Sequence, residues 1–587
     1  MKQFLTLFIM IILMNACSTP PSATNNTTEF NKQFDDYKNR FVEQMWKIYP
    51  MWATEIGYHN YDSILEINNA DYRNRILQFV KENLDSLQGF DSTKLSDLNK
   101  MDAEIIKNFL QKSKFNIEEL KSWQWDPSGY NASGNLSYML SENYESLNSR
   151  IINISKKLEQ IPAYYTAAKE NIQNPSPEHL KLAIEQNSGG FESLEATLKD
   201  SLAQSTLSSD EKTKVETEMK NAMAAVQDYI SFLKNLKNEN GRSFRLGSDL
   251  YGKKFNFEIE SSYTYEQIYD SAMQRKKYLH TQMATLATQL WPKYFGNTPI
   301  PGDTLTLISK VIDTLSMNHV KPEDFQSTIE KQIPELEKFV TDHNLIYLDP
   351  SKPLKVRKEP AYMAGVAGAS ISAPGPYDKN GNTYYNVGSL AGWDAKRAES
   401  YLREYNNYTL QILNIHEAVP GHYTQLVYSN NSPSIIKSIL GNGAMIEGWA
   451  VYGELMMLEN GYGNNEPEMW LMYYKWNLRT VCNTLLDISV HTRNMSHDDA
   501  MHLLTKEAFQ QNAEAEGKWR RVMLTNVQLT SYYTGFKEIC DLREECKKIQ
   551  GDKFNLKAFH EKFLSYGSAP VKLIRAQMLA DLQQKKQ

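Results

Sequence analysis

The chain has 587 residues, of which 41% are apolar and 23% charged, and its formal net charge at pH 7 is -6. This composition is typical of globular proteins and differs from that of disordered, collagen-like or membrane-spanning chains. The acidic balance and the lack of a long Lys/Arg cluster in the sequence argue against nucleic acid as a partner.

The N-terminal residues are typical of an exported bacterial protein. Lys2 precedes an apolar run from Phe4 to Met14, which is shorter than a membrane span of about 20 residues and fits the hydrophobic region of a signal peptide. Ala16 and Cys17 follow, and this pair resembles a lipobox, in which the cysteine is lipidated and becomes the mature N-terminus. An ordinary cleaved signal with an incidental cysteine is the alternative.

These features predict a lipoprotein. Residues 1–17 would form the signal peptide, and residues 18–30, "STPPSATNNTTEF", would form a flexible tether. The lipid on Cys17 would then be the only contact with the membrane. It would hold the protein in the bacterial cell envelope, on its periplasmic or outer-membrane face.

Residues 31–587 are predicted to form one mostly helical domain. Apolar residues recur at helical spacing in residues 146–172, and a Ser-Ser-Asp cap precedes a long amphipathic run in residues 208–236. Strand-forming residues are concentrated in residues 361–390, around a Gly-Pro turn and an Asn-Gly turn. From Ala395 onward the sequence predicts a helix that runs unbroken into the motif described next.

The stretch "LNIHEAVPGHYTQL" contains His416, Glu417 and His422. Two zinc-binding histidines on one regular helix normally stand four residues apart, because four residues turn about 400° and return both rings to one face. A spacing of six residues turns about 600° and leaves the two rings roughly 120° apart. Pro420 and Gly421 lie between the histidines, so we expect a local bulge that returns His422 to the face of His416.

A catalytic zinc site needs a third protein ligand and one open position. Glu447 follows His422 by 25 residues, on a predicted second helix that begins at a Gly-Asn-Gly turn. With Glu447 as the third ligand, Glu417 would be free to act as general base toward a zinc-bound water, whose pKa falls to about 7. The segment that contains the site would then be residues 355–587.

Two of these strings, "HEAVPGHYTQL" and "EGWAVYGE", closely resemble the zincin-like bacterial family called domain of unknown function 885, which is similar to metallopeptidases. Other segments resemble the family in the same order, so that the resemblance extends over residues 31–580. These segments are "LEQIPAYYTAAKENI", "FRLGSDLYGKKF", "LLDISVHTRNMS", "QLTSYYTGFKEI" and "FNLKAFHEKFLSYGSAPVKLI".

The resemblance implies a mainly α, zincin-like helical metallopeptidase architecture with a small β element before the zinc-binding helix. In such an architecture His416, His422 and Glu447 would bind Zn²⁺, and Glu417 would activate the water. Tyr532 matches a family tyrosine whose hydroxyl would stabilise the oxyanion of the tetrahedral intermediate. The family has proline-glycine where this sequence has Asn526-Val527, which puts the loop geometry before Tyr532 in question.

Two further site residues lie on one predicted helix. His491 matches a family position and would hold the substrate carbonyl or the intermediate as a third catalytic residue. Asp487, one helical turn earlier, would fix the tautomer of His491. The alternative is a His-Asp pair that only packs helices together.

The remaining candidate residues surround the motif. Arg521 would bind a substrate carboxylate through its planar fork, or would be one of several solvated basic residues on its helix. Glu454 would support a ligand histidine, or would be a surface glutamate. Tyr384 and Tyr385 would lie along an extended substrate, as edge strands do in peptidases, or would belong to a solvent-facing hairpin.

These residues together predict a zinc-dependent hydrolase of the cell envelope that cleaves peptide bonds, with short peptides as substrates. A non-catalytic helical lipoprotein that binds a ligand is the alternative from a different class, and a zincin fold that has lost activity is a third possibility. Whether cleavage is terminal or internal stays open at this stage.

Overall fold

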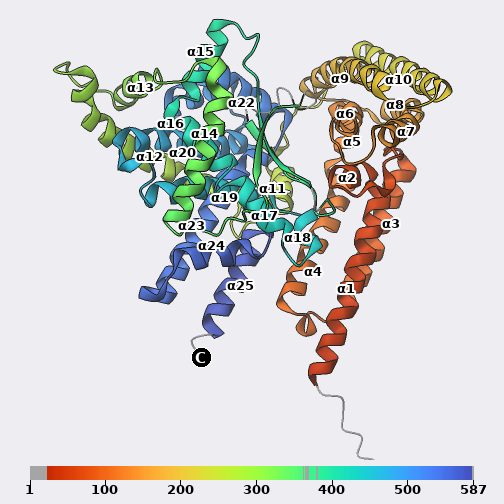
Figure 1. Ribbon diagram of the computed structural model, residues 1–587, viewed down its shortest axis with the longest axis horizontal. Coiled ribbons are helices and arrows are strands. Elements are labelled where there is room, and N and C mark those ends of the chain that lie inside the picture. Colours follow the sequence, from red (N-terminus) through yellow and green to blue (C-terminus); the bar gives the residue numbers. More distant parts are fainter. Residues whose placement is uncertain (1–22, 361–362, 364–368, 379–380, 585–587) are drawn as a thin grey trace, which may run out of the picture.

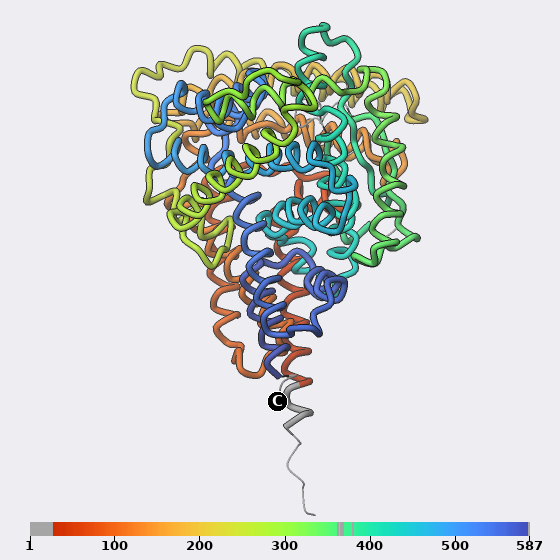
Figure 2. The backbone as a smooth tube through the Cα atoms, turned by 90° about the vertical axis from the view of Figure 1, so that its left-hand side faces the viewer, coloured from red at the N-terminus to blue at the C-terminus, as the bar shows by residue number. Residues whose placement is uncertain are grey.

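The computed structural model describes residues 23–360, 363, 369–378 and 381–584, and Cys17 lies outside these residues. Helix α1 (Ala23–Ile48) begins inside the predicted tether, so that residues 23–30 are helical rather than flexible. The reason is that the polar stretch continues directly into an amphipathic pattern. Figure 2 shows α1 and the last helix, α25 (Val571–Gln584), extending toward the same end of the molecule.

The chain is mainly helical, as predicted. In Figure 1 the helices of the first 240 residues lie on one side of the molecule. After α1 these are α2 (Pro50–Glu55), α3 (Ala70–Gln88), α4 (Asp97–Phe115), α5 (Ser122–Trp125), α6 (Ser133–Ser141), α7 (Leu147–Leu158), α8 (Ile161–Asn171), α9 (Pro177–Gln204) and α10 (Ser209–Asn235).

Most of the later helices lie on the other side in the same view. Before the sheet these are α11 (Gly247–Glu258), α12 (Tyr265–Phe295), α13 (Thr304–Leu315) and α14 (Phe325–Asp342). After the sheet they are α15 (Ala395–Glu404), α16 (Asn407–Glu417), α17 (His422–Asn430), α18 (Ile435–Ile439), α19 (Gly443–Glu459), α20 (Pro467–Thr492), α21 (His497–His502), α22 (Asn512–Leu524), α23 (Ser531–Gln550) and α24 (Leu556–Leu564). None of the helices in the described part of the chain is both long enough and apolar enough to cross a membrane.

A three-stranded sheet precedes the helices that carry the motif. Its strands are β1 (Leu354–Lys358), β2 (Ala369–Ser372) and β3 (Thr383–Val387), in the order β1-β3-β2. Strand β3 pairs in parallel with β1 and antiparallel with β2, so that β2 is an edge strand. Strands β2 and β3 fall within the predicted segment 361–390. Strand β1 was not predicted, because "LKVRK" has too few apolar residues to indicate a strand.

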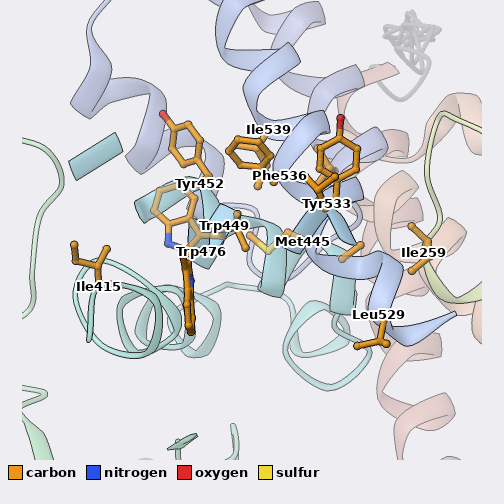
Figure 3. Packing of buried hydrophobic residues seen from close by; sticks show 14 of the residues in the cluster. Ile259, Ile415, Met445, Trp449, Tyr452, Trp476, Leu529, Tyr533, Phe536 and Ile539 are labelled. Atoms are coloured by element: carbon orange, nitrogen blue, oxygen red, sulfur yellow. The ribbon is translucent and has the colours of Figure 1, made fainter. Parts of the chain in front are cut away.

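The apolar side chains form two clusters. The larger one includes residues from α1 to α4 and from α11 to α25, and Figure 3 shows its packing around Trp449 and Phe536. The smaller one is built mainly by α6 to α10, with buried residues such as Phe191 and Tyr229. The predicted helical domain over residues 31–587 thus contains a second hydrophobic cluster on the N-terminal side.

Local capping explains where several helices begin. Ser208 and Glu211 form a capping box at the start of α10, as the Ser-Ser-Asp signal predicts. The helix predicted to run unbroken from Ala395 is interrupted instead. The side chain of Asn406 accepts hydrogen bonds from the backbone N–H groups of Tyr408 and Thr409, and α16 begins there as a new helix.

A buried ion pair joins the helices near the motif to the N-terminal side. The ammonium of Lys437 on α18 lies 2.7 Å from Asp102 of α4, and both side chains are almost completely buried. Asp102 also accepts hydrogen bonds from Ser434 and Lys38, at 2.7 and 2.9 Å. Removing one partner of such a pair typically costs about 3–5 kcal/mol, because a charge is left buried without compensation.

Helices α19 and α23 approach so closely that only glycine fits between them. A Cβ added to Gly535 would lie 1.7 Å from the carbonyl oxygen of Ala444, and one added to Gly448 would lie 2.4 Å from the Cα of Gly535. Since Glu447 precedes Gly448 and Tyr532 is one turn before Gly535, this contact sets the distance between two predicted site residues.

We expect Gly535→Ala to lower the free energy of unfolding by about 3 kcal/mol, because the new methyl group has no room against a helix backbone. Urea unfolding followed by circular dichroism measures this loss. Gly189→Ala is the matched control: Gly189 lies in α9 with nothing within 4 Å of an added Cβ. It should gain about 0.5–1 kcal/mol from helix propensity. Equal stability of the two variants would contradict the packing argument.

Candidate functional site

The six-residue spacing of the motif is accommodated by a break between two helices, where the sequence predicted a bulge. Helix α16 ends at Glu417, and α17 begins at His422. The N–H of Gly421 donates to the carbonyl of Ile415 at 3.0 Å, which folds the connection back over the end of α16. A Cβ at Gly421 would lie 1.8 Å from the carbonyl oxygen of His416, so that this turn requires glycine.

This break brings the two imidazoles together. The ring centroids of His416 and His422 lie 4.7 Å apart, with their planes at 87°. The connection passes through a cis Val419-Pro420 peptide bond. The carbonyl of Pro420 accepts a hydrogen bond of 2.8 Å from the indole of Trp449, a buried side chain on α19.

Glu447 lies against both imidazoles, as the sequence predicted. Asn442 caps the start of helix α19, because its side chain accepts a hydrogen bond from the N–H of Met445, and the first turn of the helix leads to Glu447. The Oε2 atom of Glu447 lies 3.6 Å from Nε2 of His416 and 3.3 Å from Nε2 of His422. Among the described residues this oxygen has no hydrogen-bond partner.

These separations fit a tetrahedral metal site. Two ligand atoms bound to Zn²⁺ at about 2.0–2.2 Å in tetrahedral geometry lie roughly 3.3–3.5 Å apart. The two measured distances from Glu447 are close to this value. A set of one nitrogen from each histidine and one oxygen from Glu417 also lies within 4.8 Å, so that two carboxylates face the pair of imidazoles. The oxygen of Glu447 is the one that lies close to both Nε2 atoms.

Glu417 is half-buried beside the two histidines. Burial raises the pKa of its carboxyl above the ordinary value, and the neighbouring imidazoles lower it in part. A raised pKa makes a carboxylate a better proton acceptor, which suits a general base.

Glu454 supports His416 from behind. Its Oε1 atom lies 2.7 Å from Nδ1 of His416 and accepts a hydrogen bond of 3.0 Å from the indole of Trp476. Glu454 is completely buried, so that it is not a surface residue. A carboxylate in this position holds Nδ1 protonated and leaves Nε2 free to bind a metal ion.

The centre thus contains three carboxylates and two imidazoles. In the described part of the chain, Glu417, Glu447 and Glu454 form no ion pair with a lysine or arginine; the ion pairs of Glu447 and Glu454 are with histidine. Burial lowers the pKa of His416, but the neighbouring carboxylates of Glu447 and Glu454 outweigh this effect and raise it to about 10. The excess of buried negative charge favours a cation between these side chains.

Tyr532 lies on the open side of the centre. Its ring centroid is 6.4 Å from that of His416. Burial and the charge of Glu447 raise the pKa of Tyr532 to about 12, so that its hydroxyl stays protonated and can donate. Arg521 donates to the amide oxygen of Gln528 at 2.7 Å and to the hydroxyl of Tyr532 at 3.4 Å.

The loop before Tyr532 has an unusual backbone conformation. Val527, where the resemblance implies a glycine, has a φ of 73°, a conformation that is strained for a β-branched residue. The carboxylate of Asp487 holds this loop, because it accepts hydrogen bonds from the backbone N–H groups of Val527 and Leu529 at 2.9 and 3.2 Å. It also accepts one from the hydroxyl of Tyr251 at 2.7 Å.

The structure therefore places His491 and Asp487 differently from the prediction. Nε2 of His491 lies 2.9 Å from the carbonyl oxygens of both Val522 and Thr525, and its Nδ1 has no partner among the described residues. His491 is buried and does not line the cavity at the metal centre. Asp487 and His491 each bind backbone groups around the end of α22.

Tyr385 also lies away from the cavity. It is on the central strand β3, its side chain is completely buried, and its hydroxyl donates to Asn414 at 2.7 Å. The guanidinium of Arg357 lies over the ring of Tyr384. The cavity is bordered instead by the edge strand β2 and by Lys358 at the end of β1.

A cavity of about 1680 Å³ opens over the centre. It is larger than the about 300–1,000 Å³ of typical small-molecule sites. The sheet borders it with Ala369, Ser370 and Ile371 of β2, and α9 contributes Leu182. Helices α20 and α22 contribute Arg479, Glu514 and Lys518, which the sequence analysis did not select. On α22 the spacing of Glu514, Lys518 and Arg521 would have indicated a shared helix face.

A protein-family model described as "Bacterial protein of unknown function (DUF885)" matches residues 50–578. The chain belongs to this family. The resemblance of the motifs to domain of unknown function 885 is therefore confirmed, and it extends over most of this chain. No functionally curated protein matches it.

Two solved structures are similar to this DUF885 protein. One is a candidate lipoprotein of unknown function from Shewanella oneidensis, 52% identical, with a TM-score of 0.85 and a match that covers 93% of this chain and 99% of that chain. The other is a candidate lipoprotein from Colwellia psychrerythraea, 17% identical, with a TM-score of 0.79 and coverage of 94% and 100%. At 17% identity the second likeness shows the fold alone.

We expect Glu454→Gln to weaken Zn²⁺ binding by about 10–100-fold, because a neutral amide no longer enhances the basicity of His416. Competition with a fluorescent zinc chelator measures the change. Glu538→Gln is the control, since it removes a buried carboxylate of α23 that contacts Ser261 and Ser262 instead of a histidine. Equal affinity in all three proteins would show that Glu454 does not act on the metal site.

We expect Gly421→Ala to abolish high-affinity Zn²⁺ binding, because the methyl group would displace the turn that places His422 beside His416. Elemental analysis of the purified variant, beside the wild type, gives the zinc content per chain. A full complement of zinc in the variant would contradict this reading of the helix break.

Proposed function

We propose that this DUF885 protein is a zinc-dependent hydrolase that cleaves peptide bonds, with short peptides as substrates. The observation that carries the proposal is the arrangement of Glu447 against two imidazoles, at distances that match the edges of a tetrahedral site. The three carboxylates without a lysine or arginine partner, among the described residues, support a bound cation.

His416, His422 and Glu447 would hold the metal ion. Two imidazoles and one carboxylate are a donor set that suits Zn²⁺ and leaves a position open for substrate or water. When bound, Zn²⁺ supplies Lewis-acid polarisation of a carbonyl and lowers the pKa of water.

The protein side chains would move the protons. Glu417 would accept a proton from the attacking water and deliver it to the nitrogen of the leaving amine. The overall reaction breaks the amide C–N bond, adds hydroxyl to the carbonyl carbon and adds hydrogen to the nitrogen. Tyr532 would donate a hydrogen bond to the carbonyl oxygen as negative charge develops on it.

The shape of the cavity supports a peptide substrate. Strand β2 borders the cavity as the edge of the sheet, and an extended peptide can pair with such an edge through backbone hydrogen bonds. The cavity has walls from α9, α20 and α22, so that a short, unfolded chain would enter more readily than a folded protein.

The solved relatives support attachment to the cell envelope. The structure from Shewanella oneidensis, at 52% identity, is described as a candidate lipoprotein. We infer that Cys17 of this chain carries the lipid and that the protein faces the periplasm or lies at the outer membrane.

Glu417→Gln tests the proposed mechanism. The variant should keep about one zinc ion per chain and lose about 10²–10⁴-fold in kcat, since the amide cannot accept the proton. Hydrolysis of a mixed library of short peptides, followed by mass spectrometry, measures turnover, and elemental analysis measures zinc. His422→Ala should lose both zinc and turnover.

Other outcomes would redirect the assignment. Full turnover in Glu417→Gln would remove Glu417 as the base. Absence of zinc from the wild type, even after zinc is added, would remove the peptidase proposal. A ligand-binding lipoprotein would then be the leading interpretation.

A further inference from the structure

One wall of the cavity carries more positive than negative charge. On α22, Glu514, Lys518 and Arg521 are spaced by four and three residues and share one face. Arg479 projects from α20 toward the same wall, where its Nε and Nη2 atoms donate to one oxygen of Glu514 at 3.2 and 2.6 Å. Glu514 thus compensates Arg479, and two cationic side chains remain.

Lys518 is the first of these two. Only 5% of the residue is exposed, and its ammonium lies 3.8 Å from the oxygen of Glu514 that already binds Arg479. This contact is the shortest one between the ammonium and a charged group in the described part of the chain, and it is too long for a hydrogen bond. Burial and the neighbouring Arg479 lower the pKa of Lys518, and Glu514 offsets this in part, with the result at about 7. A buried ammonium in this situation is stabilised by an additional anion.

Arg521 is the second. Its contacts are with neutral groups, the amide of Gln528 and the hydroxyl of Tyr532, and it has no carboxylate partner in the described part of the chain. A guanidinium has five N–H donors in a planar fork, so that donors remain for a carboxylate. Since Arg521 contacts Tyr532 and Tyr532 lies beside His416, Arg521 is the member of the pair that is closer to the proposed metal ligands.

We propose that Lys518 and Arg521 bind a carboxylate of the substrate and so direct cleavage to the residue that carries it. This inference rests on the proposed peptidase function and deepens it. A peptide offers such a group either as its C-terminal carboxylate or as an acidic side chain next to the scissile bond. We assign the C-terminal carboxylate, because Lys518 and Arg521 line the same cavity as His416, and Arg521 contacts Tyr532 beside that histidine. This assignment makes the enzyme a carboxypeptidase.

The neighbouring Arg520 serves as a matched control. Arg520 lines the same cavity from the same helix and has the same charge as Arg521, but its side chain is 56% exposed and already pairs with Glu185 of α9. Replacing it removes one positive charge from α22 without removing a donor from the proposed site.

The test compares three peptides with a blocked N-terminus. The first has a free C-terminal acid, the second is the C-terminal amide of the same sequence, and the third is an amide in which glutamate replaces the last residue. The wild type should cleave the free acid with a kcat/KM about 10–100-fold above that of the plain amide, the range expected for hydrogen bonds to a charged group. Lys518→Met should remove this preference, with KM for the acid rising to the value for the amide. Lys518→Arg should restore part of it, and Arg520→Gln should retain all of it.

The glutamate amide distinguishes the two sources of the carboxylate. A preference for it over the free acid, lost in Lys518→Met, would overturn the terminal assignment in favour of an acidic side chain. Equal kcat/KM for all three peptides in the wild type would overturn the carboxylate site itself and leave the peptidase function intact.

Calorimetry separates this inference from the proposed function. N-acetylphenylalanine and its amide are titrated into the full-length protein and into Lys518→Met. Binding of the acid that is at least 10-fold tighter than that of the amide, and that is lost in Lys518→Met, supports the anion site even if no peptide is cleaved. Equal binding of acid and amide would overturn the site.

Discussion

The site depends on one electrostatic constraint, the placement of one buried and two partly buried carboxylates around two imidazoles. Glu447 and Glu454 are close to opposite nitrogens of His416, and Glu417 follows it in the chain. Removing several like charges from water costs more free energy than the folded state can tolerate unless opposite charges compensate them. Protons on the imidazoles compensate this charge in part, and a divalent cation compensates it more fully. The surrounding fold is consistent with this requirement, since the indole of Trp449 holds the connection between the histidines at Pro420 and the indole of Trp476 donates to Glu454.

The helices around the centre hold these groups at short range through steric constraints. Gly421 allows the chain to fold back over the end of α16, and the contact of Gly448 with Gly535 brings α19 and α23 together. Each of these glycines is adjacent to, or one turn from, a residue of the site. Because backbone atoms meet directly at these glycines, the neighbouring site side chains have little freedom to move apart. Such preorganisation is what a metal site requires of its protein.

Much of the centre was predictable because its chemistry follows local sequence patterns. His416, His422 and Glu447 form a recognisable spacing, and Glu454 lies two turns after Glu447 on the same helix. The helix break was harder to predict, since proline and glycine indicate a distortion without specifying its form. Asp487 and His491 have the same residue types whether they contact substrate or a loop, and only the fold distinguishes these cases. For Tyr385, strand order decides exposure, and order depends on pairing between distant segments. Lys518 was missed because its role follows from the partners that it lacks in the folded chain.

The walls of the cavity come from elements of both hydrophobic clusters. All of the proposed metal ligands belong to helices of the larger cluster, whereas Leu182, which also lines the cavity, comes from α9 in the smaller one. Substitutions along α9 therefore change the wall that a ligand meets while leaving the packing around the metal centre intact. A division of this kind makes the family evolvable: descendants can diverge in what they admit to the cavity while keeping the same reactive centre.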